Sequence, residues 1–118
     1  MFSTVEKLGF MYKYLDIDAP AVMAMMANEK IRLIDVRNLD EVVRGVLPNA
    51  IHIPLSLIPD QEFDVMLDEK IIFYCHSGIR SAQAAAFIAD KIDVQTYNLR
   101  GGILAWARED FPFVEYQS

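Results

Sequence analysis

The most reactive side chain in the sequence is the thiol of Cys75, which opens the segment CHSGIRS, residues 75–81. It is the chain's single cysteine, and Gly78, Arg80 and Ser81 follow it closely. A glycine lets such a short loop curl until successive amide N–H groups point at one centre and favour a thiolate there. Arg80 can bind an anion through two parallel hydrogen bonds, and Ser81 can cap a helix or donate to the sulfur. The segment therefore predicts a nucleophilic cysteine inside an anion-binding loop.

The elements on either side place this loop at one edge of a sheet. The apolar run KIIFYC, residues 70–75, is typical of a strand buried on both faces, and residues 80–91 are typical of a helix. In open α/β sheets, ligands bind beyond the carboxyl ends of the strands, where a helix N-terminus favours negative charge. A single cysteine can also be an inert core residue, but this position favours a functional role. We expect the helix to present one alanine face to the sheet: Ala82, Ala85, Ala86 and Ala89.

Strand-like and helix-like runs alternate along the rest of the chain, which is typical of an α/β domain with a parallel sheet. We expect one domain over residues 1–118, with a core of about residues 17–113 and an extra amphipathic helix before residue 15. Asp18 is a candidate N-cap and Pro20 lies in the first turn of its helix. The expected strands are 31–36, 49–54, 70–75 and 94–98, and the expected helices are 18–28, 38–45, 80–91 and 101–110, with short helical turns over 55–67 broken at Pro59.

Composition excludes several classes of function. The 118 residues are 53% hydrophobic and carry a net charge of −6, which argues against nucleic-acid binding through a broad basic surface. No apolar run is long enough to span a membrane, and the first residues do not resemble a signal peptide, so we expect a cytoplasmic protein or a soluble domain fused to another. A single cysteine forms no internal disulfide or redox pair. With only His52 and His76 besides, we expect neither a metal nor another cofactor.

Three segments resemble the signatures of the rhodanese family of sulfurtransferases, in the family's order. CHSGIRS is similar to its active-site loop, Cys-x-x-Gly-x-Arg-Ser, and LRGGILAW, residues 99–106, is similar to its closing signature. The segment LIDVRNLDEVVRGVLPNAIHIP resembles its first signature, with matches at Asp35, Val36, Arg37, Glu41, Gly45, Pro48 and Ala50. It departs at Val46, where the family has histidine, and at Asn49, where it has glycine. These departures concern local packing or partner contacts more than the cysteine loop.

The resemblance implies a fold and a reaction. The fold would be rhodanese-like, a central parallel sheet of about five strands with helices on both faces. Cys75 would take the outer sulfur of a donor such as thiosulfate or a persulfide, and would pass it from a cysteine persulfide to a thiol or cyanide. The acceptor could be of the thioredoxin or glutathione kind. The persulfide anion would be bound and stabilised by the loop that follows the nucleophile: His76, Ser77, Gly78, Ile79, Arg80 and Ser81.

Two other functions use the same fold. A family of dual-specificity phosphatases has a loop one residue longer, Cys-x5-Arg, which can surround a tetrahedral phosphate. The spacing here is Cys-x4-Arg, from Cys75 to Arg80, and it favours a single sulfur atom. A non-catalytic binding module is the second alternative, although such modules often lack the cysteine.

The remaining polar residues have structural as well as functional interpretations. Asp35, Arg37 and Glu41 are interpreted as structural support, with Arg37 and Glu41 close enough in sequence to pair across a helical turn. His76 could tune the thiolate or face solvent, and His52 could face solvent or be a satisfied core residue. Several other residues have packing or turn roles: Met23, Met25 and Met26 in the core, Trp106 against the sheet, and Gly101 and Gly102 in a tight turn beside the cysteine loop.

Overall fold

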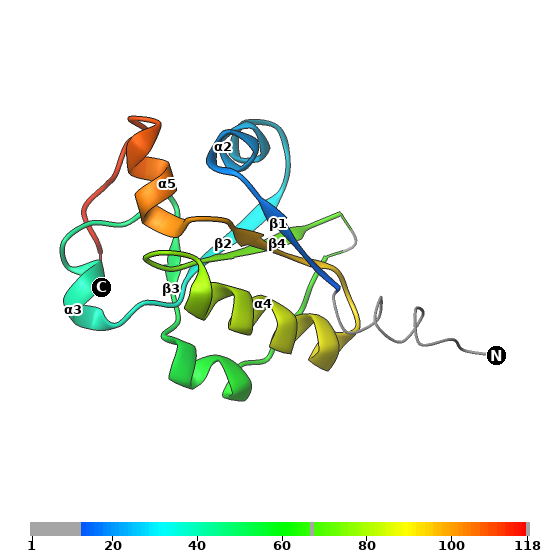
Figure 1. Cartoon of the computed structure of the whole chain (residues 1–118). Coiled ribbons are helices and arrows are strands. Elements are labelled where there is room, and N and C mark those ends of the chain that lie inside the picture. The colour runs from blue at the N-terminus through cyan, green and yellow to red at the C-terminus, as the bar shows by residue number, and fades with distance from the viewer. Residues whose placement is uncertain (1–12, 67, 118) are drawn as a thin grey trace.

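Five parallel strands form the centre of the fold, in the spatial order β1-β5-β4-β2-β3 (Figure 1). The computed structural model describes residues 13–66 and 68–117. The strands are β1 (Tyr14–Ile17), β2 (Ile31–Asp35), β3 (Ile51–His52), β4 (Lys70–Tyr74) and β5 (Thr96–Leu99). The helices are α2 (Ala19–Asn28), α3 (Leu39–Val42), the 3-10 helix η1 (Leu55–Asp60), α4 (Ile79–Ile92) and α5 (Gly102–Arg108). The predicted α/β fold is confirmed.

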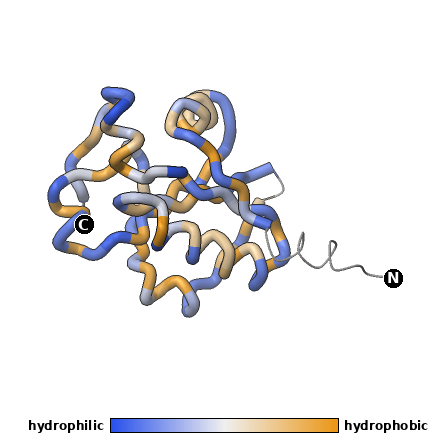
Figure 2. Tube along the Cα trace, viewed as in Figure 1, coloured by the Kyte–Doolittle hydropathy of each residue, from blue (hydrophilic) through white to orange (hydrophobic). Residues whose placement is uncertain are grey.

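Helices cover both faces of the sheet. Figure 1 shows α2 and α5 on one face and α4 with η1 on the other. The central strand β4 serves both layers because successive side chains point to opposite faces. Ile71, Phe73 and Cys75 pack in the layer of α4, whereas Ile72 and Tyr74 pack in the layer of α5. In Figure 2 the hydrophobic colours follow these inner elements and the hydrophilic colours gather at the turns. None of the described helices is long and apolar enough to cross a membrane.

The start of α2 agrees with the sequence. The side chain of Asp18 accepts a hydrogen bond from Ala21 N at 2.9 Å, so it caps the helix, and Pro20 lies in the first turn. The expected break at Pro59 is wrong, because η1 continues through it to Asp60. Proline's fixed φ is compatible with a short 3-10 helix.

The structure also adds an edge strand that the sequence analysis did not predict. Tyr14 and Leu15 belong to β1, which pairs with β5, rather than to the extra helix expected before residue 15. The rest of that predicted helix falls on residues 1–12, outside the described part of the chain. The sequence YLDI has a weak pattern because both of its central residues are exposed, as an edge strand permits.

The buried face of α4 differs by one position from the predicted alanine face. Ala85 and Ala89 are buried as expected, but Ala82 and Ala86 are only half-buried. The buried face consists of Ser81, Ala84, Ala85, Ile88 and Ala89. The alanine pattern alone could not fix the phase of the helix, because two overlapping sets have the same spacing of three and four. Burying the large Ile88 decides between them.

Candidate active site

The loop between β4 and α4 is fastened from behind by the first turn of α5. Ile103 N donates to Cys75 O at 3.0 Å, and Leu104 N donates to His76 O at 3.3 Å. This close approach requires Gly102, since a Cβ built there would lie 2.4 Å from Cys75 O and 2.5 Å from His76 O. The predicted glycine turn beside the cysteine loop is therefore confirmed. With these carbonyls directed toward α5, the loop can turn its amide groups the other way.

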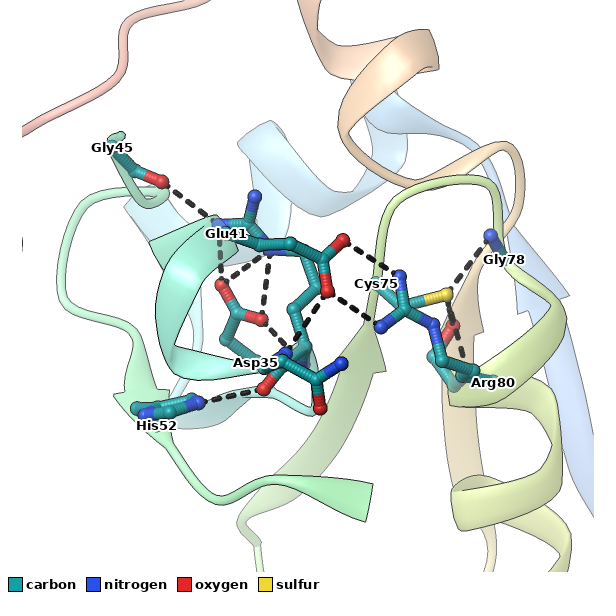
Figure 3. Close-up of polar contacts among 10 residues, drawn as sticks. Asp35, Glu41, Gly45, His52, Cys75, Gly78 and Arg80 are labelled. Atoms are coloured by element: carbon teal, nitrogen blue, oxygen red, sulfur yellow. Dashed lines mark hydrogen bonds and ion pairs between the residues drawn. The ribbon is translucent and has the colours of Figure 1, made fainter. Parts of the chain in front are cut away.

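Those amide groups converge on the sulfur of Cys75. Gly78 N lies 3.1 Å from Sγ, and the amide and hydroxyl of Ser81 lie 3.4 Å and 3.3 Å from it (Figure 3). Gly78 reaches this position with φ +101°, a conformation that other residues resist. Burial of the sulfur tends to raise the pKa of Cys75, but hydrogen bonds from Ser81, Gly78 and Ser77 outweigh it and lower that pKa below the value of an ordinary thiol. The loop therefore favours the thiolate form of Cys75 over the neutral thiol.

Asn98 supports the sulfur-binding groups from β5, a role that the sequence analysis missed. Its Oδ1 accepts a hydrogen bond from the Ser81 hydroxyl at 2.6 Å, and its Nδ2 donates to Asp16 Oδ1 at 2.9 Å and to Gly78 O at 3.3 Å. Two oxygen partners of Nδ2 fix the orientation of the amide. Asn98 directly precedes the LRGG segment and pairs with Phe73 of β4. The register of β5 against β4 was therefore the signal that could have revealed this role.

The single proton of the Ser81 hydroxyl cannot serve two acceptors at once. While it is donated to Asn98, the Ser81 oxygen can accept the S–H proton of a neutral Cys75. When Cys75 is ionised, the hydroxyl can turn and donate to the sulfur instead. The contact between Ser81 and Cys75 therefore suits both protonation states.

Arg80 does not extend freely into solvent, because it forms two hydrogen bonds with Glu41. Its Nη1 and Nη2 atoms lie 2.7 Å and 2.8 Å from the two carboxylate oxygens, and the pair joins α4 to α3 beside the sulfur (Figure 3). The hydrogen bonds from Arg80, supported by the Asn38 amide, lower the pKa of Glu41 to about 2 against a smaller effect of burial. The predicted pairing of Arg37 with Glu41 is wrong, because each of them has another partner.

Comparisons with known proteins identify the family of this chain. The model of the rhodanese-like domain matches residues 18–109. The chain belongs to the rhodanese-like domain family. It is 37% identical to a sulfurtransferase of Allochromatium vinosum over 84% of this chain and 94% of that one. It is 28% identical to the thiosulfate sulfurtransferase GlpE of Vibrio cholerae over 84% and 93% of the two chains. The solved rhodanese-related protein of Thermoplasma volcanium superposes with a TM-score of 0.75 at 29% identity, covering 86% of this chain and 98% of that one.

Within this rhodanese-like domain, Asp35 and Arg37 form a buried ion pair. Arg37 Nη2 lies 2.8 Å from Asp35 Oδ2 and also 2.8 Å from Gly45 O. Burial lowers the pKa of Arg37, but its hydrogen bond and charge interaction with Asp35 outweigh that effect and raise the pKa. The Arg37 guanidinium lies 5.8 Å from the centre of the Tyr74 ring, whose hydroxyl accepts from Leu47 N. These contacts hold the segment after α3, and none of the hydrogen bonds among the described residues joins the pair to the sulfur.

The histidines occupy different environments. His76 is exposed at the start of the cysteine loop. His52 is half-buried, with Nε2 2.7 Å from Arg37 O and its ring 5.6 Å from that of Tyr116. No group of three or more potential ligands among His, Cys, Asp and Glu gathers around a metal-sized site in the described residues.

Both departures from the rhodanese pattern have local explanations. Asn49 has φ +66°, the left-handed conformation that glycine adopts readily and asparagine tolerates. Val46 is buried, and its backbone exchanges two hydrogen bonds with Val114 in the C-terminal segment. Asn49 therefore keeps the conformation of the turn, and Val46 holds the C-terminal segment in place. Neither residue is among those that contact the sulfur.

Proposed function

We propose that the protein is a sulfurtransferase that carries sulfane sulfur on Cys75 between a donor such as thiosulfate and a thiol or cyanide acceptor. The observation that supports this most directly is the convergence of the Gly78 and Ser81 amides on a thiol of lowered pKa. A cysteine that served only packing would need no such donors. The relatives named as sulfurtransferases support the same reaction class.

The reaction has two displacement steps. The Cys75 thiolate attacks the outer sulfur of thiosulfate, a new S–S bond forms, the S–S bond of thiosulfate breaks, and sulfite leaves with the electron pair. The thiolate of the acceptor then attacks the outer sulfur of the Cys75 persulfide, and Cys75 leaves as a thiolate. A covalent intermediate of this kind gives ping-pong kinetics. Amides from His76 to Ser81 stabilise the anion in both steps.

Arg80 is the group that binds the anionic end of the donor. It is one-third exposed, so solvent and small anions can reach it, but its guanidinium is already paired with Glu41. The donor therefore exchanges with the carboxylate of Glu41 or joins it at the edge of the guanidinium. Asp35 and Arg37 act as support at a distance. A cytoplasmic location and an acceptor of the thioredoxin or glutathione kind remain predictions.

Intact-mass measurement after mixing with thiosulfate tests the proposal. Because Cys75 is the only cysteine, a gain of one sulfur atom reports on it alone, and Cys75→Ser provides a matched control that should gain none. Release of sulfite should equal the sulfur bound. No adduct with thiosulfate, mercaptopyruvate or a small persulfide would favour a binding module. Turnover of an aryl phosphate without an adduct would favour a phosphatase.

A further inference from the structure

A hollow of about 360 Å³ lies beside the cysteine loop. We call it the Arg44 hollow, after the arginine in its wall. His76 of the cysteine loop, Ile103 of α5 and Phe113 of the C-terminal segment line it together with Glu41 and Arg44. His76 follows Cys75 directly in the chain, and Glu41 holds the Arg80 guanidinium beside the sulfur. The hollow therefore adjoins the cysteine loop at His76 and the Arg80–Glu41 pair at Glu41.

The unpaired charge of this hollow is positive. Arg37 and Glu41 also reach its wall, but each is engaged in an ion pair, with Asp35 and with Arg80. Arg44 is exposed, and its side chain forms no hydrogen bond or ion pair with any residue that the structure describes. In a chain of net charge −6, an unpaired arginine in a concave site is a local feature that attracts an anion.

The other walls of the Arg44 hollow carry apolar side chains that suit the carbon chain of a ligand. Ile103 is half-buried, and Phe113 is 41% exposed although it is a large apolar residue. The volume lies in the range of small-molecule sites and exceeds what cyanide or thiosulfate needs. A ligand that uses the whole hollow therefore has an anionic group for Arg44 and a short carbon chain for Ile103 and Phe113.

Building on the proposed sulfurtransferase function, we propose that the Arg44 hollow binds the sulfur acceptor and that this acceptor is a small thiol bearing a carboxylate. Arg44 binds the carboxylate, and the carbon chain lies against Ile103 and Phe113. The thiol loses its proton to solvent and attacks the outer sulfur of the Cys75 persulfide. The acceptor leaves as a persulfide, and Cys75 returns to the thiolate.

Discharge of the preloaded protein tests this assignment. Protein loaded with thiosulfate and freed of excess donor is mixed with 3-mercaptopropionate, with the uncharged 3-mercaptopropanol, or with cyanide. Arg44→Ala should slow discharge by 3-mercaptopropionate about tenfold, the value of one hydrogen bond between charged groups, and leave the other two within twofold. Arg44→Lys should recover part of the loss. Arg108→Ala, which removes an exposed arginine of α5 outside the hollow, should change none of the three.

A second measurement separates this proposal from the proposed function. S-methyl-3-mercaptopropionate cannot accept sulfur, so its binding to unloaded protein, followed through the NMR signals of the His76 ring, needs no persulfide. Saturable binding that Arg44→Ala abolishes supports the hollow even if thiosulfate fails to load Cys75. The assignment is overturned if Arg44→Ala loads sulfur normally and is discharged by all three acceptors as fast as the unaltered protein, and if the unaltered protein does not bind the methylated thiol. That result would leave the proposed sulfurtransferase function intact.

Discussion

Replacing Gly102 with alanine should disturb both the stability of the fold and the geometry of the cysteine loop. A methyl group there would lie 2.4 Å from Cys75 O and 2.5 Å from His76 O, well inside the normal contact distance. Both neighbours are backbone atoms, so no side-chain rotation relieves the overlap. The first turn of α5 must move away from the loop, and the hydrogen bonds from Ile103 N and Leu104 N must lengthen or break.

The cost can be worked out from these contacts. Alanine in the left-handed conformation of Gly102, φ +55°, costs about 1–2 kcal/mol. Losing two backbone hydrogen bonds adds about 1 kcal/mol each. The free energy of unfolding should therefore fall by about 3–4 kcal/mol, a large share of the roughly 5–15 kcal/mol typical of a domain. Loading of sulfur should slow by about tenfold or more, because the freed carbonyls let the Gly78 amide turn away from the sulfur.

Urea unfolding and the rate of persulfide formation measure the two effects. Asp110→Ala is a suitable control, because Asp110 has nearly the same backbone conformation, φ +58°, in an exposed turn after α5. It should change stability by less than about 1 kcal/mol and should not affect loading. If Gly102→Ala were as stable as the unaltered protein and loaded sulfur at the same rate, the close approach of α5 would not be what shapes the loop.

Three further changes test individual interactions. Glu41 has a pKa of about 2 in the folded protein, so its ion pair stabilises the fold fully above about pH 4.5, and this effect is lost as the pH falls toward 2. Glu41→Gln should therefore make the stability of the protein depend less on pH in that window. Identical acid-unfolding profiles of the two proteins by tryptophan fluorescence would contradict this. Ser81→Ala keeps the amide but removes the hydroxyl, so it should raise the pKa of Cys75 in alkylation-rate titrations, whereas an unmoved midpoint would exclude donation by the hydroxyl. Asp35→Asn leaves the buried charge of Arg37 uncompensated and should cost about 3 kcal/mol in chemical denaturation; a loss below about 1 kcal/mol would argue against the pair's importance.

The segment from β4 through α4 was the most predictable part of the molecule. A continuous apolar run ending in the cysteine loop has few interpretations other than a central parallel strand, and the structure buries all of Ile71–Tyr74. The turn at Gly101 and Gly102 was predictable for a similar reason, because two adjacent glycines permit a close approach. Both features depend on the conformational preferences of a few neighbouring residues, and the structure has both of them.

Contacts between distant segments could not be predicted in the same way. The sequence suggested pairing Arg37 with Glu41 because they are four residues apart, but Glu41 instead meets Arg80, thirty-nine positions away. That choice depends on where α3 lies against the start of α4, which no local pattern encodes. The role of Asn98 was hidden likewise, because it follows from the pairing of β5 with β4.

The position of Cys75 shows how hydrogen bonds can favour the ionised form of a buried thiol. Cys75 is only 1% exposed and packs in the same apolar cluster as Phe73, which is the environment of an inert cysteine. Low polarity raises the cost of an unsatisfied anion, and it also strengthens each hydrogen bond that satisfies one. Because donors from Gly78 and Ser81 reach the sulfur, the second effect outweighs the first. Removing a donor should therefore raise the pKa of this cysteine more than it would raise that of an exposed one, so the glycines that orient the donors are needed for the thiolate to form.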